Sequence, residues 1–140
     1  MRIAIAVDGS PASTRAVRHV ASLCKRFTET PEVVVIHVDA PLLRSVAIEL
    51  GTQGVDRYHA ENGKFALKAA KAALARAKVG FGEKLLIGDP AATIVRFLKT
   101  ARCDHLVMGS HGRGAFKNLV LGSVATKVLS QSDVPVTIVR

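Results

Sequence analysis

Short apolar runs rich in β-branched residues recur along the chain, and stretches with helical periodicity separate them. A continuous apolar run of strand length is typical of a strand that is buried on both faces. Alternation of such strands with helices is typical of a parallel sheet covered on both sides, with right-handed crossovers. We therefore expect a three-layer α/β domain whose open sheet has five mainly parallel strands in the order 3-2-1-4-5. The expected strands are Ile3–Val7, Val33–Val38, Lys84–Ile87, His105–Met108 and Val136–Val139.

Four helices are expected on the two faces of this sheet. Ser10 is placed to cap the first helix, with Pro11 at its first position, where a missing N–H costs nothing. The second runs from about Tyr58 to Lys78, the third follows the turn Gly88-Asp89-Pro90, and the fourth begins at Ser123. Three- and four-residue spacing predicts the buried faces. These comprise Ala16, Val17, Val20, Cys24 and Phe27 on the first helix, Leu67, Ala70, Leu74 and Ala77 on the second, Ile94, Val95 and Leu98 on the third, and Val124, Val128 and Leu129 on the fourth.

The segment Ala40–Gly54 shows little periodicity of either kind and contains Pro41, Gly51 and Gly54. We expect a long irregular connection here, with at most a short helix around Leu43–Glu49. Long loops in compact domains are usually functional or mobile.

The length of 140 residues fits a single domain, residues 1–140, and a chain of this size buries roughly two-thirds of its unfolded surface. No apolar run approaches the length of a membrane span, and the run near the start is shorter than the core of a signal peptide. The expected location is therefore the cytoplasm. In a reducing compartment Cys24 and Cys103, which have no partner at metal-ligand spacing, are interpreted as small buried hydrophobic residues.

The chain is basic, with 20 Lys and Arg against 11 Asp and Glu and a net charge of +9. Such a surface attracts polyanions in general, and it does not choose among them. Aromatic residues make up 4% of the chain and Trp is absent, which argues against a stacking platform for single-stranded nucleic acid. Specific nucleic-acid binding is not expected, and non-specific binding rests on net charge alone. One side of the second helix carries lysines that a solvated face explains: Lys64, Lys68, Lys71 and Lys78.

The densest chemical signal is the glycine-rich segment Met108–Ser123. Gly109 follows the fourth strand, Gly112 comes three residues later, and Gly122-Ser123 opens a helix. Glycine lets backbone N–H groups approach an anion, and a helix N-terminus adds further donors and a partial positive charge. Ser123 can also cap its helix and offer a hydroxyl to a phosphate. The segment therefore predicts a phosphate-binding loop.

The predicted loop carries its own cations and lies at a favourable place in the sheet. Arg113 and Lys117 are placed to neutralise phosphate charge. Ligands of open α/β sheets bind outside the carboxyl ends of the strands, at the point where the strand order reverses. Asp8 ends the first strand and Gly109 follows the fourth, so both are expected beside this switch point.

The spacing Gly109-x2-Gly112-x9-Gly122-Ser123 matches in full the G-2x-G-9x-G-[S/T] pattern of the ATP-binding branch of the universal stress protein family. The chain resembles this family over nearly its whole length, with Ala40–Gly54 least constrained. The resemblance implies a Rossmann-like fold of the adenine nucleotide alpha hydrolase-like kind. It also implies a small stress-response module that binds ATP or a related adenine nucleotide, and Mg²⁺ is compatible with it. The further matching segments are Val7-Asp8-Gly9-Ser10, Ile36-His37-Val38, Gly88-Asp89-Pro90 and Pro135–Val139.

The resemblance also implies a role for each position of the site. Asp8 would contact the ribose, and the backbone of Val38 would contact the adenine edge. The phosphates would be held by Gly109, Gly112, Gly122 and Ser123. Met108 and Val124 would flank the nucleotide, and Ala6 and Pro11 would pack near the sugar or base.

Other nucleotide-binding patterns fail. The P-loop string G-x4-G-K-[S/T] is absent, and the dinucleotide fingerprint fails because Lys117 stands where a third glycine is needed after Gly112-Arg-Gly114. Two readings of the site stay open: a regulatory nucleotide-binding module with little or no turnover, and a slow ATP hydrolase or phosphotransferase. Catalysis needs a positioned base or metal ligands near the γ-phosphate, and the sequence offers only His111 and Asp8 as bases. We favour the module, with no catalytic residue and no protein metal site assigned.

The last strand, within Val134–Val139, is expected at one edge of the sheet and is apolar and uncharged. An open edge of this kind invites pairing with another chain. Pro135 blunts only its start, and Arg140 guards only its end. We expect a homodimer in which two copies pair these strands antiparallel about a twofold axis, and the family resemblance points to the same interface.

Overall fold

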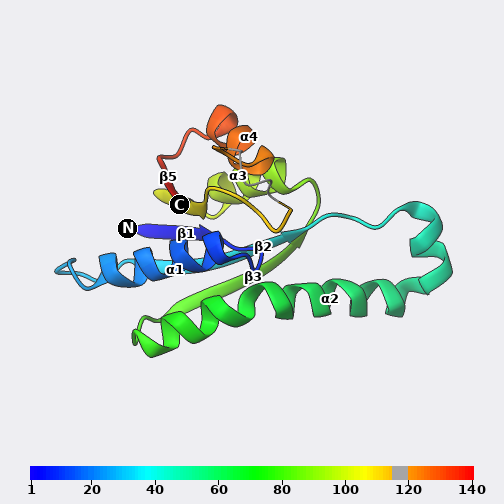
Figure 1. Cartoon of the computed structure of the whole chain (residues 1–140), viewed down its shortest axis with the longest axis horizontal. Helices are drawn as coiled ribbons and strands as arrows, with labels where there is room; N and C mark the ends of the chain where they lie inside the picture. Colours follow the sequence, from blue (N-terminus) through cyan, green and yellow to red (C-terminus); the bar gives the residue numbers. More distant parts are fainter. Residues whose placement is uncertain (115–119) are drawn as a thin grey trace.

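The computed structural model describes residues 1–114 and 120–140, which form a sheet of five parallel strands (Figure 1). The strand order is β3-β2-β1-β4-β5, so the predicted order is confirmed. The central strand β1 pairs with β2 on one side and β4 on the other, which places Ile5 opposite Val35 and Val107. The strands are β1 (Arg2–Ala6), β2 (Glu32–Asp39), β3 (Phe81–Ile87), β4 (His105–Gly109) and β5 (Val136–Val139).

Helices cover both faces of the sheet, as the three-layer α/β prediction requires. On one face lie α1 (Pro11–Cys24) and α2 (Arg44–Arg76), and on the other lie α3 (Pro90–Thr100) and α4 (Ser123–Gln131) (Figure 1). None of the helices in the described part of the chain combines the length and apolar character needed to cross a membrane.

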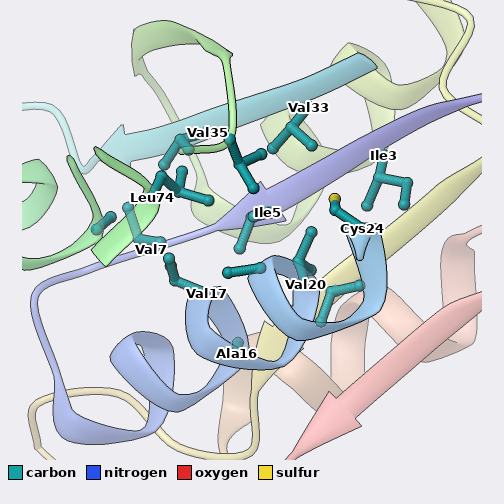
Figure 2. Close-up of a cluster of buried hydrophobic side chains, with 14 of the residues drawn as sticks. Ile3, Ile5, Val7, Ala16, Val17, Val20, Cys24, Val33, Val35 and Leu74 are labelled. Carbon is teal, nitrogen blue, oxygen red and sulfur yellow. The ribbon is translucent and has the colours of Figure 1, made fainter. Parts of the chain in front are cut away.

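The core has one cluster on each side of the sheet, because successive strand residues point to opposite faces. Beneath α1 and α2, Ile3 and Ile5 of β1 pack with Val33 and Val35 of β2 (Figure 2). Burying a large aliphatic side chain stabilises a fold by about 1.5–3 kcal/mol, so the buried side chains of β1 and β2 contribute strongly to the stability of the sheet. The cluster on the opposite side includes Ala4, Val34, Ile36, Ile94, Leu98, Leu106, Met108 and Val128.

Side-chain caps start the two helices that follow turns of the type Ser-Pro and Asp-Pro. The Ser10 hydroxyl accepts a hydrogen bond from Ser13 N at 3.1 Å, with Pro11 at the first helical position, as predicted. Asp89 does the same for α3 by accepting from Ala92 N at 3.0 Å. Each cap satisfies an otherwise unpaired N–H and is worth about 1 kcal/mol.

The prediction for Ala40–Gly54 was wrong in its main part. α2 begins at Arg44, so most of this segment is helical rather than irregular, although the expected short helix around Leu43–Glu49 is present. Gly51 interrupts α2 with φ 67° and ψ 173°, a conformation that glycine adopts readily. The chain then resumes the helix and continues to Arg76.

The early part of α2 has no hydrophobic periodicity because it packs on no core. Figure 1 shows it reaching beyond the end of the sheet. Leu43 is 76% exposed and Ile48 is 72% exposed, and Leu50 also lies at the surface. A helix that buries no face leaves no spacing signal in the sequence.

Two residues predicted to be buried are exposed. Phe27 lies beyond the end of α1 at Cys24, so it no longer shares the buried face of that helix. Leu129 is turned away from the sheet, whereas its neighbour Val128 is fully buried. Cys24 and Cys103 are buried and unpaired, and burial raises the pKa of both thiols, in agreement with their interpretation as small hydrophobic residues.

Candidate functional site

A cavity of about 540 Å³ opens at the carboxyl ends of β1, β2 and β4. This volume lies in the range of about 300–1,000 Å³ that small-molecule sites occupy. The cavity lies at the point where the strand order reverses. From β1, the chain places β2 and β3 on one side of the sheet and β4 and β5 on the other. Pro11, exposed at the start of α1, is not among its lining residues. The other predicted site residues all line it: Ala6, Asp8, Val38, Met108, Gly109, Gly112, Arg113, Gly122, Ser123 and Val124.

The turn from β1 to α1 presents Asp8 to the cavity. Oδ1 of Asp8 accepts a hydrogen bond from Ser10 N at 2.9 Å, which fixes the carboxylate across the turn. Gly9 between them has φ 80°, and a Cβ there would lie 2.8 Å from the Phe65 ring of α2. The turn therefore requires glycine for both its backbone conformation and its close packing.

Three glycines of the predicted phosphate loop, Gly109, Gly112 and Gly122, lie where a Cβ would meet a neighbouring atom. A Cβ on Gly109 would lie 2.7 Å from the Ala12 carbonyl carbon, so this glycine lets the end of β4 pack on α1. A Cβ on Gly112 would lie 2.9 Å from Oδ2 of Asp8. At Gly122 a Cβ would lie 3.2 Å from Ser110 O, an oxygen that accepts a 2.7 Å hydrogen bond from Gly122 N. The spacing seen in the sequence thus corresponds to a loop folded back upon itself.

The amino terminus of α4 faces this loop with its N–H groups uncovered by a side-chain cap. Gly122 is the N-cap residue and makes no side-chain cap hydrogen bond, so the predicted capping role of Ser123 was wrong. Ser123 is instead the first helical residue and is exposed along the cavity wall. The first N–H groups of a helix, together with its dipole, form a ready site for an anion.

Arg113 brings a positive charge to the cavity from within the loop. Its guanidinium lies over the Phe65 ring, 5.2 Å from the ring centre, in a cation–π contact. This contact ties the loop to α2 and keeps the charge beside the cavity. His111 is held on the same loop by a 2.8 Å contact between its Nδ1 and the Ser110 hydroxyl. Lys117, the other predicted cation, lies outside the described residues.

The opposite part of the cavity is apolar. It is formed by side chains on the α3 and α4 side of the sheet, where a planar group can be held between strand and helix. Helical spacing predicts Ile94 only as a core residue, and nothing in the sequence marks Ile36 or Pro90 as part of the site. The strand order and the packing of α3 on the sheet bring them together. The apolar lining includes Ala6, Ile36, Val38, Pro90, Ile94, Met108 and Val124.

A polar cluster borders the cavity where β2 ends. Oδ2 of Asp39 accepts hydrogen bonds from His59 Nδ1 at 2.7 Å and from Asn62 Nδ2 at 2.8 Å, both on α2. Burial raises the pKa of the Asp39 carboxyl, but the hydrogen bonds from Asn62 and His59 outweigh it, and the pKa lies below its ordinary value. The cluster fastens α2 to the end of β2. Within residues 1–114 and 120–140, no group of three or more His, Cys, Asp or Glu side chains is arranged to hold a metal ion.

Comparison with known proteins places this geometry in a family. The model of the universal stress protein family matches residues 1–140. Universal stress protein MJ0531 of Methanocaldococcus jannaschii is 31% identical over 140 residues, which cover 99% of this chain and 81% of the relative. Universal stress protein MJ0577 of the same organism is 28% identical over 154 residues, which cover 99% and 94% of the two chains.

Solved structures share the fold. The structure of MJ0577 superposes with a TM-score of 0.82 at 26% identity and covers 99% of this chain and 94% of its own. A universal stress protein from Archaeoglobus fulgidus in complex with dAMP gives a TM-score of 0.74 at 23% identity, with 100% and 98% coverage. An Arabidopsis thaliana family member with AMP bound gives 0.71 at 19% identity, with 99% and 90% coverage. The family match over the whole chain, with the glycine loop in its expected place, shows that this chain belongs to the universal stress protein family.

Proposed function

We propose that this protein binds an adenine nucleotide in the cavity at the carboxyl ends of β1, β2 and β4. The observation that carries the proposal is the loop cradle: a Cβ on Gly112 would lie 2.9 Å from Oδ2 of Asp8, and a Cβ on Gly122 would lie 3.2 Å from the backbone oxygen of Ser110. The uncapped amino terminus of α4 adds donors at the same place. Such backbone cradles suit phosphate groups.

The rest of the cavity matches a nucleoside. The apolar lining from Ala6 to Val124 suits a flat base, and Val38 at the end of β2 offers backbone groups at its edge. Asp8, fixed by Ser10 N, is suited to accept hydrogen bonds from ribose hydroxyls. Structures of relatives with AMP and dAMP support adenine as the base.

We propose ATP as a ligand of this site, in line with the glycine spacing of the ATP-binding branch. Arg113 and the α4 amino terminus would offset the charge of its phosphates. Asp8, beside Gly112, is the carboxylate that would hold a Mg²⁺ ion accompanying the phosphates.

The protein acts in this proposal as a cytoplasmic regulatory module rather than as an efficient enzyme. Of the two described carboxylates that line the cavity, Asp39 is engaged by His59 and Asn62, and Asp8, whose Oδ1 accepts from Ser10 N, is assigned to the ribose. Nucleotide occupancy would then act by favouring one conformation or partner surface.

We propose in addition that two copies associate through β5. This strand lies at the sheet edge next to β4, and its outer side has no strand neighbour within the described chain. Its four residues Val136–Val139 carry no charge, which leaves the edge open to a second copy.

Calorimetric titration with ATP, AMP and GMP tests the binding proposal. We expect saturable binding of one adenine nucleotide per chain and at least about tenfold weaker binding of GMP. Equal affinity for GMP would contradict the proposed recognition of adenine. Titrations without heat change, together with an unchanged melting temperature, would contradict the nucleotide site itself.

A further inference from the structure

His37 of β2 occupies an unusual position for a polar residue. Its side chain is 4% exposed, and it faces α1 and α2, on the same side of the strand as Val33 and Val35. Nδ1 lies 2.8 Å from the carbonyl oxygen of Val7. A carbonyl can only accept, so Nδ1 carries the hydrogen and donates it.

The other ring nitrogen has no such partner. Nε2 of His37 is buried and lacks a hydrogen-bond partner among the described residues. A buried polar atom without a partner costs stability, and a leucine here would avoid that cost. Local violations of this kind concentrate at functional positions. The contact made by Nδ1 therefore calls for a functional reason.

The reason lies in the hydrogen-bond ladder between β1 and β2. Val7 N donates to Ile36 O at 2.9 Å, which continues the parallel ladder by one step beyond the last paired residues, Ala6 and Ile36. In a regular parallel ladder the next bond would run from Val38 N to Val7 O. The ladder stops before that step, and among described residues Val7 O accepts from the imidazole instead.

We propose that His37 is a positioning residue of the nucleotide site: its side chain takes the Val7 carbonyl and so leaves the backbone N–H of Val38 for the nucleotide base. Both residues line the cavity, but the Val38 side chain packs on the α3 and α4 side of the sheet, whereas the imidazole of His37 lies on the α1 and α2 side. A free backbone N–H recognises a ring nitrogen acceptor, and the adjacent carbonyl recognises an amino group. His37 thereby determines base specificity through the backbone of Val38. The inference rests on the nucleotide site proposed above.

The same interaction fixes the turn that carries Asp8. The N–H of Val7 is bonded to Ile36 O and its carbonyl to His37 Nδ1, and Asp8 follows directly. On the far side of the turn, Phe65 packs against Gly9. One side chain thus prepares both ends of the nucleoside site, the base edge at Val38 and the carboxylate at Asp8.

The first test is hydrogen exchange of the Val38 amide in the protein without nucleotide, in wild type and in His37→Leu. With the imidazole gone, Val38 N is free to bond Val7 O, and its exchange should slow by about tenfold or more. His37→Asn, whose Nδ2 can replace Nδ1 as a donor, should exchange like wild type. An unchanged Val38 exchange rate in His37→Leu would overturn the proposal.

The second test is calorimetry of AMP and GMP with the same variants. His37→Leu should lose about tenfold in AMP affinity and much of its preference over GMP, and His37→Asn should restore both. His105→Leu is the matched control, because His105 lies at the far end of β4, bonded to Thr137 at 2.8 Å. Wild-type AMP affinity and selectivity in His37→Leu would refute the inference while leaving the site intact.

Two further results separate the remaining cases. If His37→Leu does not fold, His37→Gln is used in both tests. The glutamine side chain is polar, but its longer amide does not place a donor where Nδ1 of His37 lies. Normal Val38 exchange and AMP binding in His37→Gln would overturn the proposal. If wild type binds no nucleotide, the proposed function fails, and slowed Val38 exchange still establishes what His37 does to the ladder.

Discussion

Oδ2 of Asp8 lies 2.9 Å from the position that a Cβ would occupy on Gly112. The two residues are far apart in sequence, one in the turn after β1 and the other in the loop after β4, and parallel pairing of these strands brings them together. The close approach joins the ribose-binding carboxylate to the phosphate loop in the proposed site. Replacing the glycine hydrogen by a methyl group must displace one or the other.

Gly112→Ala should therefore weaken nucleotide binding by about tenfold through displacement of the Asp8 carboxylate. Gly114→Ala is the control in the same loop, since a Cβ there meets nothing within 4 Å. Calorimetry with AMP on both variants measures the difference. An equal loss of AMP affinity in both variants would show that the loop tolerates no side chain at either position. Unchanged AMP affinity in both would show that Asp8 does not contribute to binding.

The expected pH dependence comes from Asp39, whose pKa lies below the ordinary 3.8 because of Asn62 and His59. Its charged form stabilises the fold fully above that ordinary value, and the stabilisation is lost as pH falls through 3.8 toward the folded-state pKa. Asp39→Asn should flatten the acid limb of a plot of unfolding free energy against pH.

Urea unfolding between about pH 2 and pH 6 measures this effect. Asp56→Asn, an exposed acidic residue on the same helix, serves as the control. An acid limb of unchanged slope in Asp39→Asn would mean that the cluster does not fasten α2 to β2 through charge.

Much of the fold can be predicted from short stretches of sequence. The β-branched runs around Ile5, Val35 and Val107 predict strands because buried parallel strands need continuous apolar side chains. Ser10 and Pro11 predict the start of α1 for reasons that act within one helical turn. The glycine loop was visible for the same reason, since its spacing is a local property of the backbone.

What the sequence could not predict depends on residues brought together by the fold. The bond from His37 to the Val7 carbonyl follows from the register of β1 and β2, and the contact of His59 with Asp39 follows from the packing of α2. The early turns of α2 escaped prediction because they bury no face. The N-cap of α4 is Gly122, one residue before the predicted cap Ser123, and helix boundaries are hard to predict to within one residue.

The backbone of β5 shows which residues a dimer would use. The carbonyls of Pro135 and Val139 accept from Leu106 N and Ser110 N of the β4 side, at 3.0 and 2.9 Å. Backbone groups alternate in direction along a strand, so Thr137 also faces β4, whereas Ile138 turns its N–H to the open edge.

Ile138→Pro should therefore remove an outward donor and convert the dimer to monomer. Sedimentation measures the mass, and circular dichroism checks that the domain is still folded. A wild-type protein that sediments as a monomer well above micromolar concentration would contradict the proposed association.

Turnover should be slow. A median enzyme works at about ten per second, and we expect ATP hydrolysis here to be slower by roughly three orders of magnitude or more. The reason is that the P-loop string with its lysine is absent, Asp39 is engaged by His59 and Asn62, and Asp8 is assigned to the ribose. Phosphate release from purified protein measures it. Ordinary enzymatic rates that disappear in Asp8→Ala would establish a hydrolase instead.

The most direct test of the nucleotide site is calorimetric titration of ATP and AMP into Gly122→Val. Gly122 has φ −74° and ψ 160°, which valine can adopt, so the domain should fold, but its side chain would enter the loop beside Ser110 O. We expect wild type and the distant control Gly80→Val to bind alike, and Gly122→Val to bind at least about a hundredfold more weakly. Equal affinity in Gly122→Val and wild type would show that the glycine loop does not hold the nucleotide.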